Sequence, residues 1–169
     1  MSRVTTSASR MLAAWTIIFG LAGCASMAAP DPKDLPVVFT AAADLNPRPG
    51  GSPQSVDLLI VQLTSADKFR STDLLAMYPQ ADKLRTALAE TLVSSNRLQL
   101  GAGATNTLNL VLEPTTRFVA VIAAYEQYHR AVWRSDVQVR DESQKDPLLY
   151  RNRQLTVAVD SLSVSATLE

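Results

Sequence analysis

The side chains with the most versatile chemistry are scarce in this chain, which has one cysteine, Cys24, and one histidine, His129. A single histidine excludes metal sites built from several histidines, and no cysteine–histidine cluster is available to bind zinc. Ser135 and Asp136 lie close enough to His129 in the sequence for a Ser-His-Asp set. However, the chain lacks the G-x-S-x-G motif that presents a nucleophilic serine on a strand-to-helix turn, and the stretch EQYHRAVWR is typical of a turn between strands. We therefore predict no enzyme, no catalytic residues, no metal and no soluble cofactor.

Cys24 follows a segment that is typical of a secretory signal peptide. Residues 1–10 carry two arginines and no acidic residue, and residues 11–22, MLAAWTIIFGLA, are apolar or small. This apolar run is too short to span a bilayer, which requires roughly 20 residues. We therefore expect residues 1–23 to be removed as a signal peptide.

The sequence LAGC at residues 21–24 resembles the bacterial lipobox. The resemblance implies that a lipid is transferred to the thiol of Cys24, that the chain is cleaved before it, and that the new N-terminus is acylated. More than one acyl chain gives durable anchoring, because each buried CH₂ contributes about 0.8 kcal/mol. In Gram-negative lipoproteins an aspartate after the cysteine favours the inner membrane, so Ala25 indicates the outer membrane. The alternative is an incidental cysteine at the end of an ordinary signal peptide.

The mature chain is close to neutral and long enough for one domain. Of the 16 Lys and Arg residues two lie before Cys24, and all 16 acidic residues follow it, so its net charge is −2. Such a balance gives no strong attraction to nucleic acid. We expect residues 24–36, rich in proline and small residues, to form an extended tether, and residues 37–169 to form a single domain.

Most of this domain shows the period-two hydrophobicity of strands. The stretch 55–65 is apolar on both faces from Leu58 to Val61, and residues 117–126 are apolar on both faces, which indicates that both faces of these strands are covered. In the tail, the apolar face changes parity between residues 160 and 161. Because a one-residue slip exchanges the two faces, a bulge or a tight turn is predicted there. The predicted strands comprise residues 37–45, 55–65, 107–113, 117–126, 131–140 and the tail 154–169.

Residues 71–95 break this rhythm and have helical spacing. A serine, threonine or aspartate at residues 71–73 can cap a first helix, and Pro79 interrupts it. A second helix carries Leu84, Leu88 and Leu92 four residues apart, a stripe that we expect to pack against a sheet as core. Six to eight strands with a helical insertion after the second strand indicate a mainly β protein, most simply a sandwich.

Several short motifs follow the lipobox in order along the mature chain. They are ADLNP (43–47), VDLLIVQL (56–63), DKF (67–69), FVAVIAAYEQ (118–127) and VWR (132–134). Their order and spacing, rather than any one of them, resemble the type VI secretion outer-membrane lipoprotein family, also called TssJ, SciN or VasD.

This resemblance implies a transthyretin-like two-sheet β-sandwich with a short helical insertion after the second strand. It implies an outer-membrane-anchored lipoprotein that faces the periplasm and is a structural subunit of the type VI secretion membrane complex. In that family a loop between the first two strands binds the periplasmic domain of TssM, and TssM connects the subunit to TssL.

Carried onto this chain, the partner-binding loop is the connection between the first two predicted strands. Three prolines stiffen it, and a glycine pair permits a sharp turn, so that the loop loses less entropy on binding. Its only charge, Arg48, could pair with an acidic residue of a partner. The alternative is a solvated hairpin connection without a binding role. The loop comprises Asn46, Pro47, Arg48, Pro49, Gly50, Gly51, Ser52, Pro53 and Gln54.

Two further interpretations stay open from the sequence. Residues 140–153 mix both signs of charge and are expected to form a solvated loop, with a second partner contact as the alternative. The alternative function is a lipoprotein binding module for a small apolar ligand, which would need an apolar cavity with convergent polar groups.

Overall fold

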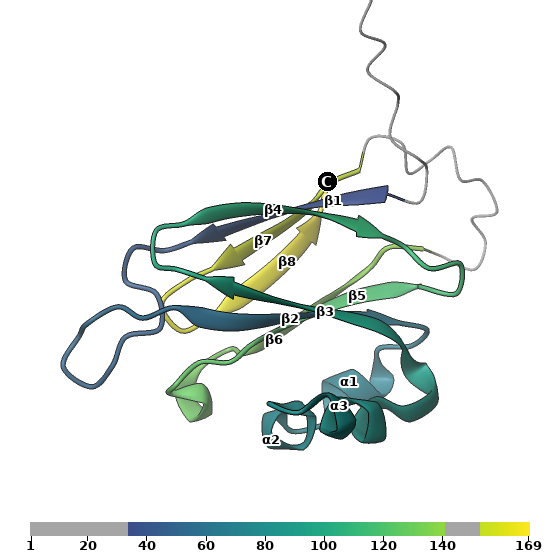
Figure 1. The fold of residues 1–169 in the computed structure, drawn as a ribbon, viewed down its shortest axis with the longest axis horizontal. Helices are drawn as coiled ribbons and strands as arrows, with labels where there is room; N and C mark the ends of the chain where they lie inside the picture. The colour runs from purple at the N-terminus through teal and green to yellow at the C-terminus, as the bar shows by residue number, and fades with distance from the viewer. Residues whose placement is uncertain (1–33, 141–152) are drawn as a thin grey trace, which may run out of the picture.

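The computed structural model describes residues 34–140 and 153–169, which form two four-stranded sheets packed face to face, with short helices on one side (Figure 1). The strands are β1 Asp34–Ala41, β2 Val56–Leu63, β3 Leu92–Leu100, β4 Thr105–Val111, β5 Phe118–Ala123, β6 Arg134–Gln138, β7 Leu155–Val159 and β8 Val164–Leu168. The first sheet has the order β4-β1-β7-β8 and the second the order β3-β2-β5-β6. Neighbouring strands are antiparallel, except that β1 and β7 are parallel. The predicted fold class, a mainly β two-sheet sandwich with a helical insertion after the second strand, is confirmed.

The core between the two sheets is built from alternating residues. In a strand every second side chain faces the same side, so each sheet contributes one apolar face to this core. The buried members include Leu35, Val37 and Phe39 of β1, Leu58 and Ile60 of β2, Val119 and Val121 of β5, and Leu155 and Val157 of β7.

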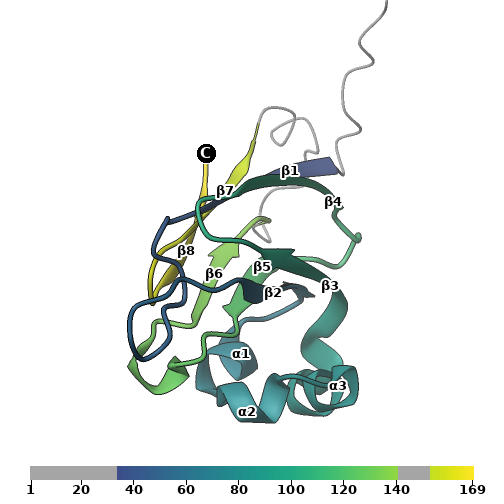
Figure 2. The same cartoon turned by 60° about the vertical axis from the view of Figure 1, so that its left-hand side comes forward.

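The second sheet is also buried on its outer face, by the helices α1 (Asp67–Ser71), α2 (Leu74–Met77) and α3 (Ala81–Leu88). Figure 2 shows these helices beneath β2, β3 and β5. Leu59 and Val61 of β2 pack there in one cluster with Phe69, Leu84 and Leu88. In the ranges that the structure describes, no helix is long and apolar enough to cross a membrane.

This second core explains why two strands are apolar throughout. In β5, Ala120 and Ile122 lie in the helix-facing cluster, while Val119 and Val121 lie in the inter-sheet cluster. β5 is also an interior strand, hydrogen-bonded to β2 and β6. The prediction of two-sided coverage is therefore confirmed for residues 58–61 of β2 and 119–123 of β5, whereas Ser55 and Glu126, at the ends of the predicted ranges, are exposed.

The helical insertion ends earlier than the sequence predicts. After α3 a short 3-10 helix, η1 (Ala89–Thr91), leads directly into β3. The prediction that Leu92 continues the helix of Leu84 and Leu88 is wrong, because Leu92 begins β3 and pairs with Leu63 of β2. Its side chain nevertheless packs against the same cluster as Leu84 and Leu88. The left-handed φ of 45° at Ala89 ends the helix there. The strand that follows, LVSSNRLQL, has too little alternation to be predicted, and its pairing with β2 overrides local preference.

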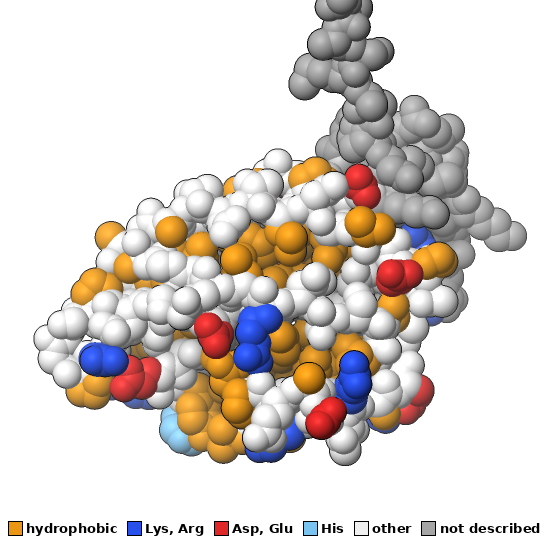
Figure 3. Space-filling view, in the orientation of Figure 1, with side chains coloured by type: hydrophobic (Ala, Val, Ile, Leu, Met, Phe, Trp, Pro, Cys, Tyr) orange, Lys and Arg blue, Asp and Glu red, His pale blue; other side chains and the backbone are white. Residues whose placement is uncertain are grey.

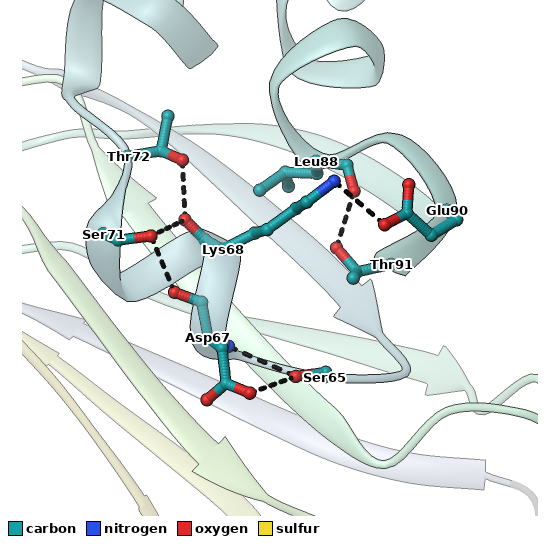
Figure 4. A network of polar contacts seen from close by, with 8 residues as sticks. All are labelled: Ser65, Asp67, Lys68, Ser71, Thr72, Leu88, Glu90 and Thr91. Atoms are coloured by element: carbon teal, nitrogen blue, oxygen red, sulfur yellow. Dashed lines mark hydrogen bonds and ion pairs between the residues drawn. The ribbon is translucent and has the colours of Figure 1, made fainter.

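Polar contacts define the ends of the short helices. The predicted cap at residues 71–73 is confirmed, because the side chain of Asp73 accepts a hydrogen bond from the N–H of Leu75 at the start of α2. The insertion itself begins earlier than predicted, with α1 at Asp67. The hydroxyl of Ser65 accepts a hydrogen bond from the backbone N–H of Asp67 at 3.3 Å, and the hydroxyl of Thr72 donates to the carbonyl of Lys68 at 2.6 Å (Figure 4). Lys68 Nζ lies 2.9 Å from Glu90 Oε1 and so connects α1 with η1. This hydrogen bond lowers the pKa of the Glu90 carboxyl. Exposed contacts of this kind fix geometry more than they add stability.

The first strand also begins and ends before the predicted residues. β1 starts at Asp34, so residues 34–36, predicted as tether, form the beginning of the strand. Ala43, predicted on the buried face, is exposed because the chain has already left the strand. Leu45 is buried as predicted, although it lies in the loop that follows.

The parity change in the tail corresponds to a tight turn, as predicted. β7 and β8 form an antiparallel hairpin in which Val159 pairs with Val164. The backbone N–H of Asp160 donates to the carbonyl of Ser163 at 2.7 Å. The turn resets the register, so that both strands present apolar residues to the same core.

Candidate functional site

The predicted binding loop lies within residues 42–55, which connect β1 to β2. Figures 1 and 2 show it in dark blue, extending beyond the sandwich at the end where β1 finishes. Because β1 and β2 belong to different sheets, this connection crosses between the sheets and is not a hairpin; a solvated connection without a binding role stays the alternative. Residues 48–53 are all exposed, so this loop tip is accessible to a partner.

Asn46 holds the base of the loop in place. Its side chain is only 5% exposed, and its φ of 47° is left-handed, a conformation that asparagine tolerates better than most residues. Its side-chain Nδ2 donates to the carbonyl of Ser55 at 2.9 Å, and its Oδ1 accepts from the N–H of Glu126 at 2.8 Å. Its own N–H donates to the carbonyl of Ser161 at 2.9 Å. Through these bonds Asn46, at the start of the loop, is connected both to Ser55 at the end of the loop and to Glu126, which follows β5.

The tip above this base closes on itself. The N–H of Gly51 donates to the carbonyl of Arg48 at 2.8 Å, and the N–H of Arg48 donates to the carbonyl of Ser52 at 3.0 Å. Gly50 and Gly51 have φ values of 109° and 92°, which glycine adopts without strain. The sharp turn predicted from the glycine pair is present.

A second segment, residues 124–132, lies beside the loop and was not identified from the sequence. Gln127 Nε2 donates to the carbonyl of Pro47 at 2.7 Å. Arg48 forms an ion pair with Glu126 of its own chain at 3.7 Å, and the two side chains are 62% and 51% exposed. Exposed pairs contribute only about 0–1 kcal/mol, so Arg48 can exchange Glu126 for an acidic residue of a partner.

Tyr125 fixes the β7–β8 turn beneath the loop. Its ring is buried, and its hydroxyl donates to the carbonyl of Ser163 at 2.5 Å, with the carbonyl of Asp160 at 3.2 Å. Burial and the nearby charge of Asp160 raise the pKa of the Tyr125 hydroxyl well above its ordinary value. Since a carbonyl of this turn also accepts the N–H of Asn46, the base of the loop is bonded to the β7–β8 turn.

The residues considered for catalysis each take part in other contacts. The ring of His129 lies 3.8 Å from that of Tyr128, and Ser135 Oγ accepts the N–H of Ala166. Asp136 accepts hydrogen bonds from Arg70, whose Nη2 lies 2.6 Å from Asp136 Oδ2. Among the residues that the structure describes, no group of three or more metal-binding side chains occurs.

Two other predicted sites fall largely outside the described residues. Cys24 and the signal peptide precede the first of them, as do residues 24–33 of the tether. Of the charged stretch 140–153, only its two ends are described; at one of them Arg140 donates to the carbonyl of Pro114.

The hollows on the surface leave the small-ligand alternative open. One between α2 and α3 has a volume of about 370 Å³ and is lined by the apolar Leu75, Ala76 and Ala87 together with Asp82, Lys83 and Thr86. One beside α3, lined by Leu59, Pro79 and Leu84 among others, has a volume of about 210 Å³, below the roughly 300–1,000 Å³ typical of small-molecule sites. Another of about 320 Å³ opens between the edge strands β3 and β4 and is lined mainly by polar residues, such as Asn96 and Asn109. Figure 3 shows acidic and basic side chains scattered over this face rather than gathered in one patch.

Comparisons with known proteins agree on one family. The family model described as "Type VI secretion lipoprotein, VasD, EvfM, TssJ, VC_A0113" matches residues 33–162. No curated protein matches the chain.

Solved structures are similar over most of this chain. The T6SS lipoprotein TssJ1 from Pseudomonas aeruginosa is 22% identical with a TM-score of 0.70, and the match covers 82% of this chain and 98% of that one. Serratia marcescens Lip, a membrane-bound component of the Type VI Secretion System, is 19% identical with a TM-score of 0.71, covering 80% and 98%. A chain in the structure of the T6SS protein TssM C-terminal domain from EAEC is 19% identical with a TM-score of 0.58, covering 81% and 98%. At these identities the similarity establishes the shared fold.

We predict that Asn46→Gly destabilises the protein and that Asn46→Ala destabilises it more. Asn46→Gly keeps the backbone conformation but leaves the groups of Ser55 and Glu126 without their partner, which should lower the free energy of unfolding by about 1–3 kcal/mol. Asn46→Ala adds the cost of a left-handed backbone, about 1–2 kcal/mol. Urea unfolding measures both, with the exposed Asn96→Ala as control. An Asn46→Gly protein as stable as the wild type would show that the side chain does not hold the loop.

We also predict that Tyr125 makes stability depend on alkaline pH. Its pKa is raised in the folded state, so the unfolded chain releases this proton first, and stability falls as the pH rises above about 10. Tyr125→Phe should lose about 1 kcal/mol at pH 8 because the hydroxyl hydrogen bond is missing, and its stability should fall less between pH 8 and pH 11. Denaturant unfolding at the two pH values checks this; equal losses in both proteins would contradict it.

Proposed function

We propose that this chain, which belongs to the type VI secretion lipoprotein family (TssJ, SciN, VasD), is a structural subunit of the type VI secretion membrane complex. In this proposal it docks onto the periplasmic domain of TssM through residues 46–54. The observation that carries this proposal is a loop that is exposed at its tip and fixed at its base. Residues 48–53 are open to solvent, while Asn46 is buried and bonded on both sides. A loop that is ordered before binding loses little entropy when it binds.

The position of the loop suits a subunit that is anchored at one end. The described chain begins at Asp34, at the start of β1, and the loop follows the other end of the same strand. Eight strand residues at about 3.3 Å each separate the two ends by about 25 Å. A lipid on Cys24 and a tether over residues 24–33 would then hold one end of the sandwich at the membrane and direct the loop away from it.

The proposed partners follow from the family and from a related structure. One similar chain occurs in the structure of the TssM C-terminal domain, which supports TssM as the protein that binds the loop. TssL would be reached through TssM. The outer membrane, with the domain facing the periplasm, is proposed from Ala25 directly after the lipidated cysteine.

The mechanism is mechanical rather than chemical. The acyl chains hold the domain to one membrane, and the paired strands distribute load through their backbone hydrogen bonds. The loop engages a protein that is rooted in the other membrane. No side chain of the docking surface needs to change its protonation or covalent state.

We predict that replacing residues 47–51 with a serine linker weakens binding to the purified periplasmic domain of TssM at least tenfold, because the prolines and glycines that shape the tip are lost. Asn46 and Gln54 stay in place, so the sandwich should keep its thermal unfolding midpoint. Leu75→Ser, at an exposed position on α2, is the control and should bind normally. A folded loop variant with wild-type affinity would overturn the loop assignment.

We predict that Cys24→Ser abolishes labelling by a fatty-acid analogue and releases the protein from the membrane fraction, because the thiol is the acceptor of the lipid. Ala25→Asp should keep the label but shift the protein from the outer- to the inner-membrane fraction on a density gradient. Mass spectrometry of the mature N-terminus reads the modification directly. An unmodified Cys24 in the wild-type protein would contradict the anchoring proposal.

A further inference from the structure

We infer that the partner contacts more than the loop: the docking surface is composite and includes the segment His129, Arg130, Ala131 and Val132, here called the β5–β6 strip. This inference rests on the proposed function and extends it. The strip follows β5 and precedes β6, at the same end of the sandwich as the loop (Figures 1 and 2). We expect the partner to contact this strip with a carboxylate and a neighbouring apolar side chain.

The apolar element of the strip is Val132, which is 61% exposed. Its backbone is nevertheless fixed on both sides, since its N–H donates to the carbonyl of Leu162 at 2.9 Å and its carbonyl accepts from the N–H of Val164 at 2.9 Å. A β-branched side chain on a fixed backbone has few conformations to lose. Val132 is therefore a pre-positioned apolar contact rather than a fraying loop residue.

Location distinguishes Val132 from the other large apolar side chains that are exposed in the described part of the chain. Leu75, 55% exposed, lies on α2 in the helical insertion. Val111, 56% exposed, ends β4 and pairs with Asp34, at the opposite end of the sandwich from the loop. Scattered exposed apolar residues are ordinary, but Val132 adjoins the loop, and the other two do not.

The strip and the loop are parts of one rigid unit, because the β7–β8 turn binds both. The carbonyl of Ser161 accepts the N–H of Asn46, and the carbonyl of the next residue, Leu162, accepts the N–H of Val132. Gln127, just before the strip, donates to the carbonyl of Pro47. A partner that engages the loop therefore meets the strip at a fixed position.

The charge of this surface defines what the partner should offer. Arg130 is exposed, and within the described ranges its guanidinium forms no hydrogen bond or ion pair. Arg48 on the loop has only its exposed pair with Glu126. The two guanidiniums favour carboxylates on the partner, because arginine binds them through two parallel hydrogen bonds.

The test measures affinity for the purified periplasmic domain of TssM, using the lipidated protein in detergent. Val132→Ser should weaken binding about five- to twentyfold. Arg130→Glu should weaken it at least tenfold at low salt and less at high salt, whereas Arg130→Lys should retain more of the affinity. Val111→Ser and Leu75→Ser are the matched controls and should bind within twofold of the wild type. Val132→Thr, which keeps the branched shape, replaces Val132→Ser if the latter fails to fold.

The outcomes separate the strip from the loop. If folded strip variants bind normally while the serine-linker variant does not, the composite surface is overturned and the loop proposal stands. If the serine-linker variant also binds normally, the loop assignment fails, and if the wild-type protein does not bind the periplasmic domain of TssM, the proposed function itself fails. If strip and control variants weaken binding equally, the effect is not local to the strip, and the inference is again overturned.

Discussion

The whole structure depends on one constraint: β2 and β5 are apolar on both faces, so their sheet is stable only when both faces are covered. The first sheet covers one face, but Leu59, Val61 and Ile122 would still meet water on the other. Burying a side chain of this kind contributes about 1.5–3 kcal/mol. The helical insertion supplies the missing layer through Phe69 and Leu88, among others. The insertion therefore has a structural role, the burial of the outer face of the second sheet.

Strand β6 attaches this layer to the sheet by polar contacts. Arg70 on α1 makes a forked interaction with Asp136, which raises the pKa of Arg70. Arg134 donates to the carbonyls of Phe69 and Thr72, at the end of the same helix. Asp136, which the sequence offers as one member of a catalytic set, thus has a structural role, because the fold pairs it with Arg70.

How much the sequence predicts depends on whether a residue follows a local pattern. The two-sided burial of β2, the turn in the tail and the fold class all follow from periodicity, and all are confirmed. β3 is missed because its residues, Ser94 to Gln99 among them, carry little pattern and are placed by pairing with β2. The role of Asn46 is missed for a related reason: its partners Ser55, Glu126 and Ser161 lie up to 115 residues away in the sequence. Local patterns cannot report contacts of that range.

The scarcity of reactive side chains is consistent with a function based on binding rather than on catalysis. The chain must cross from one sheet to the other between β1 and β2, and that crossing leaves a loop too long to be a tight turn. Ordering such a loop at the moment of binding would cost roughly 1–2 kcal/mol per residue. Here Asn46 and Gln127 order it in advance through bonds to neighbouring segments. The alternating apolar pattern that forms the sandwich tolerates many exchanges, as a TM-score of 0.70 at 22% identity illustrates. The proposed docking role therefore assigns partner recognition to side chains on the loops that the sandwich holds in place.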